Sequence, residues 1–235
     1  MLSELVIGRS AQINPYGAFR KLAPGKPWHL IGLMGVVAAF MILAFYTVVA
    51  GWTLEYLYQS LLGNLQGKDP IQLKQMFDGF RYESYRPALW FIVFMGLTAW
   101  IVISGIKNGI EKYAKILMPL LLIMLISMAV YVLTLPGAVR GLDFLFKPDF
   151  SKLTPDVILK ALGQAFFSLS IGMGTLITYG SYIQKQERLG STAISVAGAD
   201  TFIAILAGIA IFPAIFAFTN VQELNMDQIA DEGLV

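Results

Sequence analysis

Five long stretches without charged residues divide the chain, and only Asp200 interrupts the last of them. The stretches run from Leu30 to Leu54, from Pro87 to Ile106, from Ile116 to Val139, from Ala161 to Gln184 and from Leu189 to Gln222. A helix needs about 20 mainly apolar residues to cross roughly 30 Å of hydrocarbon. The pattern therefore predicts an all-α, polytopic membrane protein with five spanning helices in a lipid bilayer.

The composition agrees with this class. Hydrophobic residues make up 57% of the 235 residues and charged residues 14%, and the mean hydropathy is +0.67. So few polar side chains cannot cover a water-soluble protein of this size. The net charge of +2 is too small to indicate a nucleic-acid partner, and the absence of cysteine excludes disulfides and thiolate metal sites.

The connecting loops predict the orientation. The loops 9–29, 107–115 and 185–188 carry nine Lys and Arg residues against two acidic ones. The opposite loops, 55–86, 140–160 and 219–235, are longer and carry eight basic residues against eleven acidic ones. Because short cytoplasmic loops are dense in positive charge, we place the first set in the cytoplasm.

The fourth stretch is weakened at its midpoint, where residues 168–174 read SLSIGMG. Each glycine costs a helix roughly 1 kcal/mol relative to alanine, so a local break forms easily. Unwound backbone at membrane depth is tolerated where it is buried in protein or binds ions and polar groups. A binding site is one interpretation; the other is that small residues at 168, 170, 172 and 174 only let two helices pack closely.

Asp200 and Tyr46 are polar residues within apolar stretches. A carboxylate costs roughly 2.5–3.5 kcal/mol to insert and usually faces a cavity, an ion or a partner, although Asp200 could also snorkel towards the interface. The Tyr46 hydroxyl lies too deep for the interfacial aromatic belt and needs a partner, with Ile42 one turn away on the same face. Core packing against a buried acceptor is the alternative for both Tyr46 and Ile42.

Several segments resemble one family in the family's own order. The run GQAFFSLSIGMGTLITYGSYI is similar to the broken sixth helix of the neurotransmitter:sodium symporter family. ELVIGR resembles the end of its second helix, AFYTVVAGWTLEY its third, GIEKYAKILMPLL with LTLPGA its fifth, and ADTFIAILAGIAIFP its seventh. The resemblance implies a partial inverted-repeat sodium symporter fold, a membrane helical bundle with a discontinuous helix.

The resemblance also implies roles for residues of the broken helix. Phe167 would close over the substrate, and Ser168 would contribute to the substrate pocket and to the first sodium site. Ser170 and Met173 would line the amino-acid pocket, and Gln164 would lie just outside it. The sodium ion and an amino acid are therefore the expected ligands.

Other residues take roles by the same resemblance. Tyr46 would bond the substrate carboxylate, with Ile42 one turn below it. Tyr179 and Ser181 would belong to the cytoplasmic gate. These residues extend the predicted site from the broken helix to the first full span.

Asp200 falls where the family has either a sodium-ligand asparagine or, one turn on, the group that decides chloride dependence. An acid here supplies the negative charge that chloride supplies in animal relatives, so the resemblance implies chloride-independent transport. Glu4 matches an acid near the same region.

Gly109 and Pro119 match a glycine and a proline spaced ten apart in the family's fifth helix. Because proline removes a backbone hydrogen bond and glycine loosens a helix, this segment could unwind to let water reach a sodium site. The alternative is a glycine at a loop and a tolerated proline kink.

By the resemblance, the chain is an internal segment of a larger transporter. The family's first helix, most of its second and everything from the eighth onward would be missing, and with them the second sodium site. We therefore expect the chain to need these missing helices as partners and to be inactive alone. The expected elements are the end of the second helix at 1–9, spans at about 29–58, 87–107, 112–135, 155–184 (broken near 168–174) and 192–218, and an outer loop at 219–235.

The predicted function is that of a sodium-coupled symporter for amino acids in the cell inner (plasma) membrane. Because Met173 is adaptable and unbranched, we expect a hydrophobic or aromatic amino acid. An intramembrane hydrolase would need a histidine or lysine base at membrane depth, and the five long apolar stretches hold none, so we expect no enzyme activity. A non-transporting scaffold subunit remains an alternative, although it does not call for Asp200 or the Tyr46 hydroxyl at depth.

Overall fold

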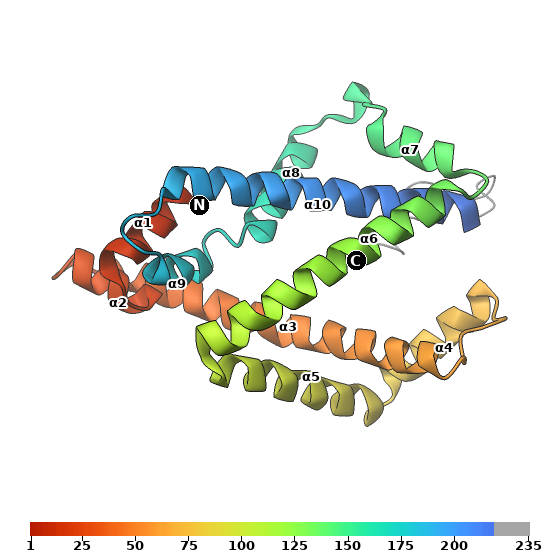
Figure 1. Cartoon of the computed structure of the whole chain (residues 1–235), viewed down its shortest axis with the longest axis horizontal. Helices are drawn as coiled ribbons and strands as arrows, with labels where there is room; N and C mark the ends of the chain where they lie inside the picture. Colours follow the sequence, from red (N-terminus) through yellow and green to blue (C-terminus); the bar gives the residue numbers. More distant parts are fainter. Residues whose placement is uncertain (219–235) are drawn as a thin grey trace. The chain divides into compact units, whose positions relative to one another are not determined.

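The structure is a computed structural model that describes residues 1–218, except for the side chains of Pro70, Lys107 and Phe218. These residues form helices and no strands, so the predicted all-α class is confirmed (Figure 1). The elements are α1 (Leu2–Ala11), α2 (Pro15–Leu22), α3 (His29–Leu61), α4 (Pro70–Tyr82), α5 (Arg86–Ile103), the π-helix η1 (Ile106–Glu111), α6 (Lys112–Leu133), α7 (Ala138–Phe146), the 3₁₀ helix η2 (Phe150–Lys152), α8 (Pro155–Ser168), α9 (Thr175–Tyr182) and α10 (Leu189–Phe218).

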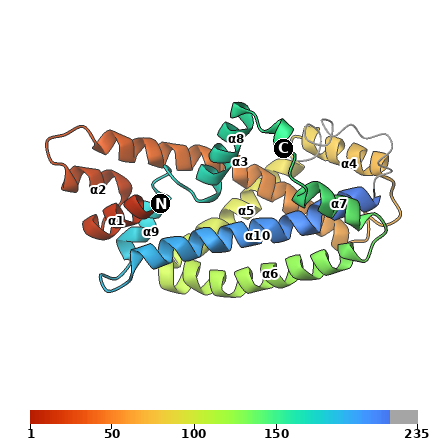
Figure 2. The same ribbon diagram turned by 90° about the horizontal axis from the view of Figure 1, so that it is seen from above.

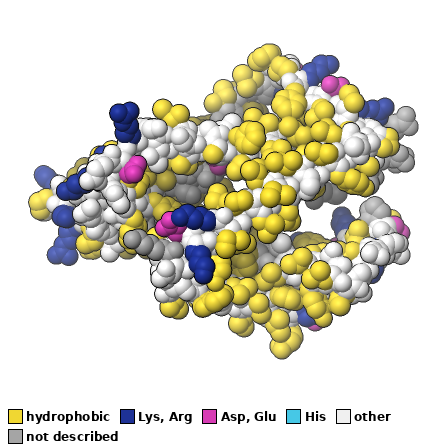
Figure 3. All heavy atoms as spheres, viewed as in Figure 1, with side chains coloured by type: hydrophobic (Ala, Val, Ile, Leu, Met, Phe, Trp, Pro, Cys, Tyr) yellow, Lys and Arg dark blue, Asp and Glu magenta, His cyan; other side chains and the backbone are white. Residues whose placement is uncertain are grey.

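Four helical segments are long and apolar enough to cross a membrane: His29–Leu61, Arg86–Ile103, Asn108–Leu133 and Leu189–Ala217. At most 17% of any of their most apolar windows is buried inside the chain's own fold. On the face drawn in Figure 3, hydrophobic side chains accordingly cover much of the surface. Exposed apolar area of this extent is suited to lipid or to other membrane helices.

The fourth predicted span is divided between α8, with 14 residues, and α9, with eight. Helix α8 begins after Thr154, whose hydroxyl accepts a hydrogen bond from the Val157 N–H, and Pro155 occupies its first turn. Such an N-cap with proline beside it is a strong start signal. Helix α4 lies within the loop 55–86 and begins with a capping box of Asp69 and Gln72.

The helices group into two compact units. Among the described residues, the unit that we call the α3 unit contains residues 7–115 and 172–183, and the α10 unit contains residues 1–6, 116–171 and 184–218. The chain passes from the α10 unit to the α3 unit between Ile171 and Gly172. This boundary lies inside the segment that separates α8 from α9.

In the α3 unit, helix α3 packs through small and polar residues. Gly32 comes close to the backbone of Pro15 in α2, and Gly51 to the backbone of Phe91 in α5. Thr47 and Glu55, one turn on either side of Gly51, are also buried. Small residues let membrane helices approach closely, which is why a helix with so few buried positions still has neighbours.

Gly8 shows how tight one of these contacts is. A Cβ at Gly8 would lie 2.1 Å from the carbonyl oxygen of Ile177 in α9, whereas one at Gly79 in α4 would meet no atom within 4 Å. We expect Gly8→Ala to lower the free energy of unfolding by about 1–3 kcal/mol, since overpacking forces backbone shifts. Gly79→Ala, the matched control, should be neutral or stabilising. Thermal unfolding in detergent measures both, and equal midpoints would contradict the contact.

In the α10 unit, α7 lies along the C-terminal part of α10 (Figure 2). A Cβ at Gly141 would be 2.4 Å from the Cα atom of Pro213, so glycine is required for this approach. The ring of Phe144 stacks near those of Phe212 and Phe216, at centroid distances of 5.1 and 5.8 Å. These contacts fix the loop between α6 and α8 against α10.

Candidate functional site

The end of α8 is a defined turn. The N–H of Ile171 donates to the carbonyl oxygen of Phe166 at 2.8 Å, and the N–H of Ser170 donates to that of Phe167 at 3.0 Å. This pair of bonds is the Schellman arrangement that closes many helices. The helix therefore stops at Ser168 because its last carbonyls are satisfied by a reversal of the chain.

The left-handed residue of this turn is Ser170, with φ +54°. The sequence interpretation placed the break at residues 168–174 and attributed it chiefly to Gly172 and Gly174, and both glycines have positive φ, of 85° and 71°. It did not single out Ser170 as left-handed, because glycine is the usual residue here and a side chain costs roughly 1–2 kcal/mol in this conformation. Strain of this kind gathers at functional sites, so the serine is a better pointer to function than the glycines.

Ser168 and Asp200 meet in the α10 unit. The Ser168 hydroxyl, at the last position of α8, donates to Oδ1 of Asp200 in α10 at 2.6 Å. The Asp200 carboxylate is half-buried and Ser168 is exposed. This contact favours a partnered carboxylate over snorkelling, and it brings two oxygen ligands of the kind that a hard cation prefers beside the end of a broken helix.

In the α3 unit, α3 contacts the second part of the break. A Cβ at Gly35 would lie 3.2 Å from both the Gly174 nitrogen and the Met173 carbonyl carbon. Ile42 and Tyr46 follow Gly35 by seven and eleven residues, so all three share one face of the helix. The Tyr46 side chain is 50% exposed, and Ile42 is half-buried. The structure thus places Ile42 and Tyr46 on the face of α3 that packs against residues 172–174.

The strain at Ser170 gives a testable pair of variants. Ser170→Gly should relieve the left-handed backbone and raise the free energy of unfolding by about 1 kcal/mol, whereas Ser170→Ala should keep the strain and remove only the hydroxyl. Chemical denaturation in detergent measures the difference. Equal stability of the two variants would show that the backbone at Ser170 is not strained.

The remaining residues predicted on the broken helix occupy varied surroundings. Gln164 and Phe167 are exposed side chains of α8. In α9, Tyr179 is 52% exposed, and the Ser181 hydroxyl donates to the carbonyl oxygen of Thr178 at 2.6 Å. Their roles in substrate binding and gating remain predictions.

Gly109 lies in the π-helix η1 and Pro119 inside α6. A Cβ at Gly109 would lie 2.1 Å from the carbonyl oxygen of Ile101, so this glycine allows α5 and η1 to touch. Pro119 interrupts the backbone bonding of α6, and a π-turn is itself a weak point of a helix. Glu4 lies half-buried in α1, and its match to an acid near the ion site of the family remains a prediction.

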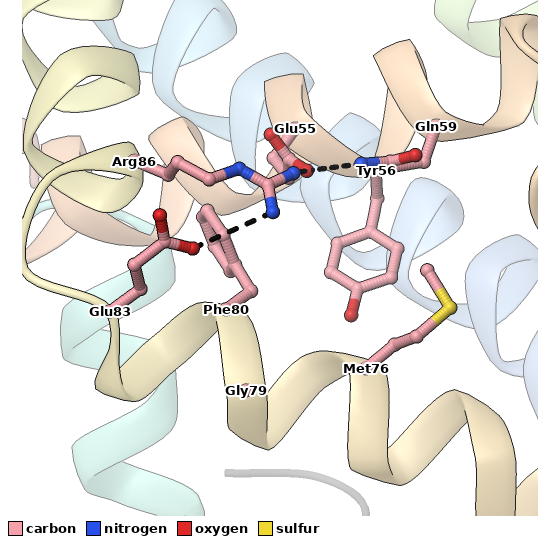
Figure 4. A pocket seen from close by; sticks show the side chains of 8 residues that line it. All are labelled: Glu55, Tyr56, Gln59, Met76, Gly79, Phe80, Glu83 and Arg86. Atoms are coloured by element: carbon pink, nitrogen blue, oxygen red, sulfur yellow. Dashed lines mark hydrogen bonds and ion pairs between the residues drawn. The ribbon is translucent and has the colours of Figure 1, made fainter.

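The sequence interpretation missed Glu55, which is buried near the C-terminal end of α3. Its carboxylate forms an ion pair with Arg86 (Figure 4) and accepts a hydrogen bond from the indole N–H of Trp90. The residue lies directly after the uncharged stretch 30–54, so the charge balance counted it with the loop 55–86, although the expected span of about 29–58 includes it. Helix α3 continues to Leu61.

Comparisons with known proteins agree on one family. Residues 72–235 match the model of the sodium:neurotransmitter symporter family. An uncharacterized sodium-dependent transporter of Haemophilus influenzae is 42% identical over 228 residues, which cover 93% of this chain and 50% of that protein. The sodium-dependent transporter YhdH of Bacillus subtilis, also uncharacterized, is 38% identical over 218 residues, covering 93% of this chain and 48% of its own length.

A solved structure is also similar. The crystal structure of MhsT in complex with L-phenylalanine has a TM-score of 0.86 and 55% sequence identity. The match covers 92% of this chain and 49% of that one. The chain thus spans about half the length of the relatives that it matches.

Proposed function

Because the chain belongs to the sodium:neurotransmitter symporter family, we propose that it forms part of a transporter that couples the entry of an amino acid to that of sodium. The observation that carries the proposal is the end of α8, where the Ser168 hydroxyl and the Asp200 carboxylate lie 2.6 Å apart beside a break in a membrane helix. Sodium would be held by oxygen atoms of this pair and by further backbone carbonyl oxygens of the segment between α8 and α9.

The substrate would bind next to this ion. Tyr46 would donate its hydroxyl hydrogen to the substrate carboxylate, and Ile42, Phe167, Ser170 and Met173 would surround the remainder. A relative of 55% identity is known in complex with L-phenylalanine, which supports a hydrophobic or aromatic amino acid for this chain. The flexible thioether of Met173 can adapt to such side chains.

Movement between the outward and inward states would use the irregular helix segments at η1 and at Pro119 of α6. Gly109 and Pro119 would let the start of the fifth family helix loosen, and Tyr179 and Ser181 would gate the cytoplasmic side. We place the transporter in the cell inner membrane, and we propose no enzyme activity. A scaffold role for the chain is the alternative, and it requires neither sodium nor an amino acid.

An uptake assay tests the proposal. In what we call the complete transporter, residues 1–235 replace the matching half of the relative crystallised with L-phenylalanine. We expect it, reconstituted in liposomes, to accumulate labelled phenylalanine when sodium is outside and to lose this uptake when potassium replaces sodium. The chain alone is the control and should not transport. Sodium-independent uptake, or none, would contradict the proposal.

Chloride gives a separate prediction. Because Asp200 carries a fixed negative charge beside the proposed ion site, we expect uptake in gluconate to equal uptake in chloride. Asp200→Ser removes that charge, so any residual uptake should then depend on chloride. A chloride requirement in the unmodified complete transporter would rule out chloride independence and leave the sodium proposal standing.

A further inference from the structure

Glu55 ties two membrane helices together. The residue is only 3% exposed. Its Oε1 contacts the guanidinium of Arg86 and accepts a bond from Gln59 Nε2 at 2.6 Å, and its Oε2 accepts from the indole N–H of Trp90. Arg86 and Trp90 lie in the first turns of α5, so both oxygens of one α3 side chain are held, chiefly by α5.

The partner Arg86 has space around it. A cavity of about 230 Å³ lies between the C-terminal part of α3 and α4, and Glu55, Phe80, Glu83 and Arg86 are among its lining residues (Figure 4). Arg86 also lies 3.6 Å from the half-exposed carboxylate of Glu83, and its guanidinium carbon lies 5.8 Å from the centre of the Phe80 ring. The guanidinium is therefore not held by close packing, because open volume and a second carboxylate lie beside it. It is held by its charge and by its hydrogen bond to Glu55.

The side of α3 that carries Glu55 lies opposite the side that carries the proposed substrate residues Ile42 and Tyr46. On successive turns of α3, a buried stripe is formed by Thr47, Gly51 and Glu55. A Cβ added at Gly51 would lie 3.0 Å from the backbone nitrogen of Phe91. At about 100° per residue, Ile42 and Tyr46 lie roughly 160° around the helix from this stripe. Because backbone hydrogen bonds make a helix stiff, a rotation at Glu55 must turn Tyr46 by a similar angle.

We propose that Glu55 is a positioning residue that fixes the rotation of α3 about its own axis and so sets the direction in which the Tyr46 hydroxyl points. Its ion pair with Arg86 and its bond from Trp90 act as the fixed reference on α5. The consequence for amino-acid binding rests on the proposed function. The effect of Glu55 on the rotation of α3 does not depend on the proposed function.

The natural absence of cysteine allows a direct test on the chain itself. A single cysteine replaces either Tyr46 or the neighbouring Phe45, whose side chain is 67% exposed. The rate at which each cysteine reacts with a maleimide in detergent reports the direction in which that position points. We expect Glu55→Gln and Glu55→Ala to change the ratio of the two rates by about threefold or more, because accessibility controls thiol reactivity. Glu83→Gln, which alters only the exposed partner of Arg86, should leave the ratio unchanged. An unchanged ratio in both Glu55 variants would overturn the proposal.

A double-mutant cycle in the complete transporter tests the link to Tyr46. We expect Glu55→Gln to raise KM for phenylalanine by about tenfold, with a smaller change in kcat, and to have little further effect in the Tyr46→Phe background. Additive effects would show that Glu55 does not act through Tyr46 and would also overturn the proposal. If the unmodified complete transporter does not transport, the proposed function fails, and the maleimide rates alone decide the positioning role.

Discussion

Asp200→Ala is expected to lower sodium-dependent uptake by the complete transporter by about 100-fold or more, equivalent to roughly 3 kcal/mol of binding free energy. The carboxylate supplies the only formal charge within its predicted span and lies against the Ser168 hydroxyl. Under the proposed function, its removal would take away both an oxygen of the sodium site and the charge that offsets sodium. Initial uptake rates at several sodium concentrations measure the effect.

Ser168→Ala and Ser195→Ala provide graded controls. Ser168→Ala removes a neutral oxygen of the proposed sodium site and should raise the half-saturating sodium concentration by about fivefold, since a single neutral polar group contributes roughly 1 kcal/mol. Ser195 is an exposed serine of the same helix as Asp200, and its replacement should have no effect. Full sodium-dependent uptake by Asp200→Ala would show that the carboxylate is not part of the ion site.

Glu55→Ala is expected to lower the free energy of unfolding of the chain by about 3–5 kcal/mol, because it leaves the guanidinium of Arg86 without its buried partner. The indole N–H of Trp90 and the amide of Gln59 lose their acceptor in the same variant. Thermal or denaturant unfolding in detergent measures the change.

Two further variants separate the ion pair from general packing. Replacing both Glu55 and Arg86 with leucine should restore much of the stability, since apolar pairs often substitute for buried ion pairs. Glu83→Gln should cost less than about 1 kcal/mol, because its contact with Arg86 is half-exposed. A full loss of stability in the double variant would mean that the carboxylate serves the fold in some other way.

Much of the helical fold could be predicted from the pattern of charges. Helix boundaries in a membrane follow from where charged residues cannot lie, and the helices α3, α5, α6 and α10 begin or end near the limits of uncharged stretches. The capping residues Asp69 and Thr154 were also visible in the sequence as start signals. Short contacts such as Gly8 on Ile177 could not be predicted, because they depend on which helices meet.

The break in the helix was predictable in position but not in detail. Two glycines and two serines marked residues 168–174, yet the left-handed residue that ends α8 is Ser170, against its intrinsic preference. The contact of Ser168 with Asp200 joins residues 32 apart in the chain, and neither residue type alone indicates the other. Glu55 was missed for a related reason: a charge at the end of an apolar run normally marks solvent, and only tertiary structure shows that α5 covers it.

The central claim is that the end of α8, with Ser168 and Asp200, forms a sodium-dependent amino-acid site. Equilibrium binding of labelled phenylalanine to the purified complete transporter, titrated with sodium, tests it most directly. The account predicts saturable binding that requires sodium, with a half-saturating sodium concentration that rises in Ser168→Ala and with binding abolished in Asp200→Ala. Phenylalanine binding with the same sodium dependence in all three proteins would contradict it.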